Sequence, residues 1–198
     1  MNAIPTRYNG IQMRSRLEAH WAAMFDLMGW TWEYEPFDRE GWIPDFWLGV
    51  GCRSYLVEVK PVVEWSDFSN FWPKIIATNP EMPVLLLGAR LFRDVYESVE
   101  DYLMIGQIRD AVVVADLGEV NCPDLVIETA TEGCVIGRCE NCERIGLCGL
   151  DELNGLFDSS CCNMSGSSGG ILHHESTERL IQSRWSIAKN KVQWRSPQ

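Results

Sequence analysis

The chain has 198 residues, 46% of them hydrophobic and 23% charged, the composition of an ordinary globular protein with one core and room for a small appended module. Residues 1–10 lack the apolar segment of an export signal, and the longest apolar runs are only strand-sized, so we expect neither export nor a membrane span. The formal net charge of −11 argues against strong, sequence-independent affinity for DNA.

The charge is unevenly distributed along the chain. Residues 1–17 contain three arginines and no acid, and residues 179–198 contain five arginines and lysines and no acid. These eight leave nine of the 17 basic residues and all 28 acidic residues between the two ends, a net charge of −19 for residues 18–178. Basic ends would suit a protein that grips a nucleic-acid backbone while its acidic body holds metal ions, and simple solvation of the ends is an equally weighted alternative.

A helix is predicted over residues 15–28, because apolar side chains recur there at helical spacing and Gly29 ends the pattern. Three strands are predicted next, at residues 31–35, 43–48 and 55–60, with a glycine-bearing turn between the last two. These elements predict an antiparallel meander directly after the helix.

The following segment predicts a second helix over residues 66–78, with a kink or a later start because Pro73 lies inside it. The short apolar run 83–88, flanked by proline and glycine, predicts a buried strand. A helix near residues 95–104 and a strand at 111–115 come next. The order predicts an α/β (α+β) fold with an αβββαβ core, in which helices flank a mixed sheet.

The sequence changes character near residue 133, because six of the eight cysteines fall in residues 134–162. The segment 165–170 is rich in glycine and serine, and an amphipathic pattern begins at Thr177. We therefore expect a core at 1–132, a zinc-binding insert at 133–164, and a tail at 165–198 whose helix packs back on the core.

Three polar side chains on the second and third predicted strands point to a catalytic site. Asp45 follows Pro44, and Glu58 and Lys60 are two residues apart. Because side chains alternate along a strand, Glu58 and Lys60 share one face. Carboxylates hold a hard cation such as Mg²⁺, and a neighbouring amine steadies the attacking water or the phosphate. The pattern favours metal-dependent cleavage of phosphodiesters.

Glu18, one turn into the first predicted helix, is a fourth candidate. We expect the helix to cross the sheet near the other carboxylates, which would make Glu18 a metal ligand. The same residue completes a Ser15-x-x-Glu18 capping-box pattern, in which the carboxylate binds a backbone amide at the start of the helix. Both interpretations stay open at this point.

The order of these features resembles the PD-(D/E)XK nuclease superfamily: Glu18 in a first helix, then Pro44-Asp45, then Glu58-Val59-Lys60, then a helix and an apolar strand. The resemblance covers roughly residues 13–90. The phrases Leu-Glu-Ala-x-Trp, Tyr-Glu-Pro and Ile-Pro-Asp-Phe-Trp-Leu look most like small phage-encoded or prophage-encoded members. The acidic body departs from the family, and so does a second helix with only Lys74 as a basic residue.

The resemblance implies a restriction-endonuclease-like core and a DNA endonuclease that uses Mg²⁺ or Mn²⁺ and leaves 5′-phosphate ends. It implies metal-binding roles for Asp45 and Glu58, with Glu18 as a further candidate, and a catalytic role for Lys60. It also implies processing of phage or mobile-element DNA in a bacterial cytoplasm. Many relatives form homodimers to cut both strands.

The cysteines predict a structural Zn²⁺. Cys139 and Cys142 have the two-residue gap with which a turn presents two thiolates to one ion. Cys161 and Cys162 are the expected second pair. Cys148, Cys134, His173 and His174 are the alternative ligands.

Two other functions remain open. In one, the zinc element binds nucleic acid and the nuclease-like core is only a scaffold. In the other, the chain is an acidic phage regulator that binds a host protein by mimicking the charge of DNA.

Overall fold

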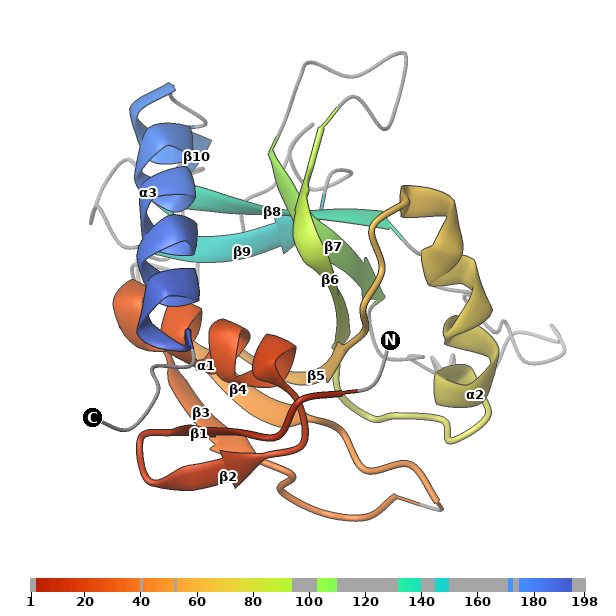
Figure 1. Cartoon of the computed structure of the whole chain (residues 1–198). Helices are drawn as coiled ribbons and strands as arrows, with labels where there is room; N and C mark the ends of the chain where they lie inside the picture. Colours follow the sequence, from red (N-terminus) through yellow and green to blue (C-terminus); the bar gives the residue numbers. More distant parts are fainter. Residues whose placement is uncertain are drawn as a thin grey trace, which may run out of the picture.

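The computed structural model describes residues 3–39, 41–51, 53–93, 103–109, 132–139, 145–149, 171–172 and 175–193 (Figure 1). The elements are β1 (Thr6–Tyr8), β2 (Ile11–Met13), α1 (Arg16–Met28), β3 (Thr31–Tyr34), β4 (Phe46–Val50), β5 (Arg53–Val59), the 3₁₀ helix η1 (Trp65–Asn70), α2 (Trp72–Ile76), β6 (Val84–Phe92), β7 (Met104–Arg109), β8 (Glu132–Cys139), β9 (Ile145–Gly149), β10 (Ile171–Leu172) and α3 (Glu175–Lys191). The predicted mixed α+β architecture is confirmed: a curled mixed sheet is flanked by helices.

The first helix forms where its end signals place it. The Ser15 side chain accepts a hydrogen bond from the backbone N–H of Glu18, and Gly29 takes the left-handed conformation at the other end, with φ 74°. The side chains of Trp21 and Phe25 are fully buried against the sheet. The helix predicted over residues 15–28 is therefore confirmed.

The central sheet begins as an antiparallel meander and then becomes mixed. β3, β4 and β5 pair antiparallel, and β6 lies parallel to β5 on the other side. A parallel neighbour requires a crossover, which η1 and α2 supply. The sequence predicts a helix over residues 66–78 with a kink or a later start at Pro73. The structure has a 3₁₀ segment followed by a short α-helix that starts at Trp72, so the later start is confirmed and Pro73 lies in the first turn.

Two expected elements differ from the structure near β6. The strand predicted at 83–88 continues to Phe92. The helix predicted near 95–104 is wrong at its end, because Met104 begins β7 and pairs with both Phe92 and Val135. Residues 94–102, like the strand predicted at 111–115, lie outside the described residues.

Each face of the sheet has its own hydrophobic cluster. One cluster lies under α1 and α3, and the other lies under η1 and α2 (Figure 1). Alternation along β5 divides its side chains between them, because Val57 and Val59 join the first cluster and Leu56 joins the second. Glu58, between the two valines, therefore points to the side of η1 and α2.

The cysteine-rich segment contributes strands to this same sheet. β8 pairs with β7, β9 and β10. The boundary expected at residue 133 therefore falls inside a strand of this sheet. Cys134, an alternative zinc ligand, is fully buried in the first cluster together with Ile136 and Leu147.

The C-terminal helix lies against the first one. Ile181 and Ala188 of α3 are fully buried. The Trp185 ring packs 4.0 Å from the ring of His20 and 4.7 Å from that of Trp21, measured between centroids.

Among the described residues, no helix is both long and apolar enough to span a bilayer.

Candidate active site

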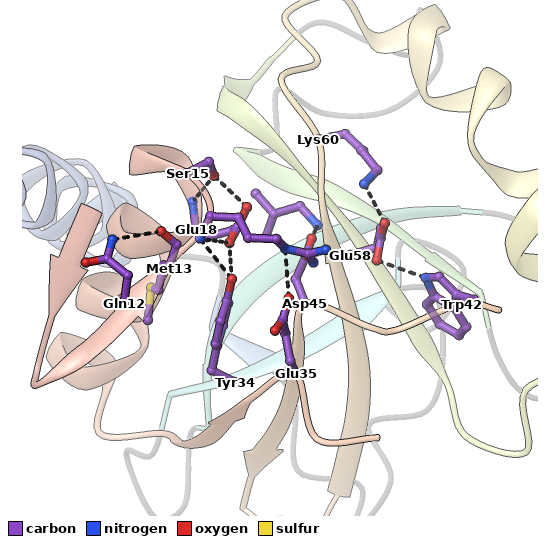
Figure 2. A network of polar contacts seen from close by, with 12 residues as sticks. Gln12, Met13, Ser15, Glu18, Tyr34, Glu35, Trp42, Asp45, Glu58 and Lys60 are labelled. Atoms are coloured by element: carbon purple, nitrogen blue, oxygen red, sulfur yellow. Dashed lines mark hydrogen bonds and ion pairs between the residues drawn. The ribbon is translucent and has the colours of Figure 1, made fainter. Parts of the chain in front are cut away.

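Asp45 and Glu58 lie at the same edge of the sheet, where β4 begins and β5 ends. Phe46 pairs with Val57, and the same register carried one step further places Asp45 opposite Glu58. The Oδ2 atom of Asp45 also accepts a 2.7 Å hydrogen bond from the backbone N–H of Val59. Both carboxylates are buried, with 3% of Asp45 and 7% of Glu58 exposed. The structure thus brings the two predicted ligands together at one rim of the sheet (Figure 2).

Glu58 is held by two donors, one on each oxygen. The Nζ atom of Lys60 lies 2.5 Å from Oε1, and the indole N–H of Trp42 donates a 2.9 Å hydrogen bond to Oε2. Trp42 is itself buried, and the Lys60 ammonium lies 5.9 Å from the centroid of the Phe71 ring. As expected from strand alternation, Glu58 and Lys60 share a face.

Arg14 covers the outer side of Asp45. Its Nη2 atom lies 2.7 Å from Oδ1 of Asp45, and its Nε atom lies 2.7 Å from Oε1 of Glu35. The arginine side chain is 55% exposed, whereas the Asp45 side chain is 4% exposed. The site therefore has a buried carboxylate below and a half-exposed guanidinium above.

Glu18 is buried beside this pair but is fully engaged with the start of α1. Oε1 accepts from the hydroxyl of Ser15, and Oε2 accepts from the backbone N–H of Arg14 and from the hydroxyl of Tyr34. The bond expected from the capping box, to the N–H of Ser15, is replaced by these contacts. Figure 2 shows Glu18 and Tyr34 on one side of Asp45, and Glu58 and Lys60 on the other.

The site holds more negative charge than its surroundings stabilise. Burial first, and then the charge of Glu58, raise the pKa of Asp45 to about 7, with Glu18 adding to the effect. The Val59 amide and the Lys60 ammonium act in the opposite direction. A carboxylate with such a pKa gains from a further positive charge at its side.

The donor set suits a hard cation that keeps part of its water shell. In the described part of the chain, no group of three or more His, Cys, Asp and Glu side chains is close enough to hold a metal ion. Mg²⁺, however, is usually held by one or two carboxylates, with waters and substrate oxygens in the other positions. Asp45 and Glu58 supply two such carboxylates, each with one donor on each oxygen, whereas the oxygens of Glu18 already accept three hydrogen bonds.

The residues around the carboxylates escaped sequence reasoning. Arg14, Tyr34, Glu35 and Trp42 reach the site from different segments, and nothing in their spacing relates them to Asp45. The absence of acid from the first 17 residues was the only signal that pointed to Arg14, and it identified a charged end rather than a contact.

The zinc prediction falls almost wholly on residues outside the description. Cys142, Cys161, Cys162, His173 and His174 are among those residues, and only the backbones of Cys139 and Cys148 are described. Cys139 ends β8 opposite Ile171, and Cys148 pairs with Val135.

Comparison of the chain with family models, with curated proteins and with solved structures gives no significant match.

Proposed function

We propose that the protein is a Mg²⁺-dependent DNA endonuclease of the PD-(D/E)XK type. The observation that carries the proposal is the convergence of buried Asp45, buried Glu58 and Lys60 at one rim of the sheet. The meander and its parallel neighbour β6 are what a restriction-endonuclease-like core requires, and this supports the assignment without establishing the family.

In this proposal, Asp45 and Glu58 hold the cation, which when bound lowers the pKa of a coordinated water and neutralises charge on the phosphate oxygens. Trp42 fixes the carboxylate of Glu58 through one oxygen. Lys60, within hydrogen-bond distance of the other oxygen, donates to the attacking water or to a phosphate oxygen. Burial of the carboxylates strengthens each of these interactions, because bulk water screens them little.

Glu18 takes a supporting role rather than a place among the ligands. Its contacts with Ser15, Arg14 and Tyr34 fix the start of α1 at the edge of the site. Its charge still acts on Asp45 and raises the pKa of that carboxyl. Glu18 therefore favours cation binding from outside the coordination sphere.

A structural Zn²⁺ on Cys139, Cys142, Cys161 and Cys162 remains part of the proposal. Elemental analysis of the purified protein should give one zinc per chain, which Cys139→Ser together with Cys142→Ser removes. A zinc-free wild-type protein would contradict this part and leave the carboxylate site unaffected.

The proposed activity is tested by DNA cleavage with Mg²⁺ or Mn²⁺ on supercoiled, branched and single-stranded substrates. Asp45→Asn and Lys60→Met should each lower the cleavage rate by at least about a hundredfold. Lys74→Met is the matched control, since Lys74 is an exposed lysine of α2, and it should cut like the wild type. If the wild type binds DNA but neither it nor any variant cleaves it, the result would favour the non-catalytic module. Neither binding nor cleavage would favour the acidic regulator.

A further inference from the structure

Arg14 occupies the position at Asp45 that a cation would need. Of the two oxygens of Asp45, Oδ2 is bound to the Val59 amide inside the sheet, and Oδ1 is bound to Arg14. The oxygen that faces outward is thus already paired with a positive charge. A guanidinium 2.7 Å away and a divalent ion on the same oxygen would repel each other strongly.

The backbone of Arg14 is fixed, but its side chain has room to move. The backbone N–H donates to Oε2 of Glu18 at 3.1 Å and to the Tyr34 hydroxyl at 3.0 Å, and the next residue, Ser15, caps α1. The side chain is more than half exposed to solvent. The guanidinium can therefore leave Asp45 without any change in the fold.

Glu35 provides a second anchor for the released guanidinium. It binds the Nε atom of Arg14 at 2.7 Å, and its own side chain is 33% exposed. Held by Nε, the guanidinium still presents its Nη groups, and two N–H donors in one plane match two oxygens of a phosphate. The neighbouring exposed residues Arg7 and Arg16 add positive charge at this end of the chain, which contains no acid.

We propose that Arg14 competes with the divalent cation for Asp45 and, once displaced, contacts a phosphate of the DNA while Glu35 holds it. This inference rests on the proposed nuclease function. In the metal-free protein, Arg14 is the counter-ion of Asp45. In the metal-bound protein, it is a substrate-binding residue. The two roles predict that one substitution changes metal affinity and DNA affinity in opposite directions.

The test measures Mn²⁺ binding by calorimetry in the absence of DNA. Arg14→Gln should bind Mn²⁺ about tenfold more tightly than the wild type, the equivalent of losing one charge-assisted hydrogen bond that opposes metal binding. Arg16→Gln, which removes an exposed arginine two residues away, should leave the metal affinity unchanged. A merely structural role for Arg14 would leave the affinity unchanged or weaken it.

DNA affinity is measured in the inactive Lys60→Met background with Mg²⁺ present. Adding Arg14→Gln should weaken binding by about tenfold and reduce its salt dependence by roughly one phosphate contact. Arg14→Lys, which keeps the charge and loses the fork, should retain the wild-type metal affinity within about threefold and still weaken DNA binding. This second variant serves where Arg14→Gln fails to fold.

The outcomes separate this inference from the function on which it rests. A wild type that binds no divalent ion overturns the proposed function itself. A wild type that binds metal and cleaves DNA, with Arg14→Gln binding Mn²⁺ no more tightly, overturns only the role of Arg14.

Discussion

The indole N–H of Trp42 donates a buried 2.9 Å hydrogen bond to Oε2 of Glu58. The turn that carries Trp42 is closed by two backbone hydrogen bonds with Arg39, and the Arg39 guanidinium reaches the carbonyls of Thr78 and Asn79 beyond α2. The loop before β4 and the loop after α2 thus act together to hold the Glu58 carboxylate in place.

Trp42→Phe should impair cleavage more than it impairs folding. Phenylalanine fills most of the space but leaves Oε2 of Glu58 without its donor, which costs about 1–2 kcal/mol of unfolding free energy. If Glu58 acts at the reacting centre as proposed, its displacement should lower kcat with little effect on KM. Steady-state cleavage and urea unfolding check both effects, with Trp47→Phe on the same sheet as the control. Equal losses in the two variants would count against the positioning role.

Metal affinity should increase with pH around neutrality. Because burial and the charge of Glu58 raise the pKa of Asp45 to about 7, the carboxyl is largely protonated at pH 6 and must release its proton to bind a cation. At pH 8 no proton has to leave, so the apparent affinity for Mn²⁺ rises between these values by roughly tenfold. Calorimetric titrations at pH 6, 7 and 8 measure it. A constant affinity would contradict the combination of a raised pKa and metal binding at Asp45.

His20 predicts a second pH effect, this time on stability. Burial chiefly, and also the charge of Lys189, lower the pKa of His20, and the hydrogen bond to the Trp185 carbonyl opposes the shift. The unfolded chain therefore binds a proton at a higher pH than the folded chain. Stability is complete above the ordinary value of 6.5 and decreases as the pH falls below it. Urea unfolding at pH 7.5 and 5.5 should show this loss in the wild type, and a smaller loss in His20→Gln.

Two glycines of the same sheet, one in β7 and one in β9, should respond differently to alanine. A Cβ at Gly106 in β7 would lie 2.1 Å from the backbone oxygen of Leu86 in β6, and the backbone there cannot move without breaking the ladder. Gly106→Ala should cost about 3 kcal/mol or more. A Cβ at Gly146 in β9 meets no atom within 4 Å, so Gly146→Ala should change stability by less than about 1 kcal/mol. Thermal unfolding of both proteins compares them directly, and similar melting temperatures would contradict the close packing of β6 against Gly106.

Local signals were sufficient for α1 and for the meander that follows it. Ser15 and Gly29 mark the two ends of α1, and alternation within β5 places Glu58 and Lys60 on one face. The helix predicted near residues 95–104 is wrong at Met104 because that residue depends on contacts that are not local. Its strand is held by pairing with Phe92 and Val135, which are distant in sequence, and a periodicity read within one window cannot detect such partners.

The same limit explains the site. The spacing of Asp45 and Glu58 was informative because a hairpin brings residues on neighbouring strands together. Arg14 and Trp42 arrive from a hairpin end and a loop, and their contacts depend on the packing of the whole core. The sequence is compatible with two roles for Glu18, and its three hydrogen bonds at the start of α1 appear only in the folded structure.

The central claim is that Asp45 and Glu58 share one divalent cation, and anomalous scattering from crystals soaked in Mn²⁺ tests it most directly. We predict a peak between the two carboxylates at about 2.1 Å from an oxygen of each, lost in Asp45→Asn. A Mn²⁺ peak bound elsewhere, with none between these residues at saturating ion, would contradict the claim.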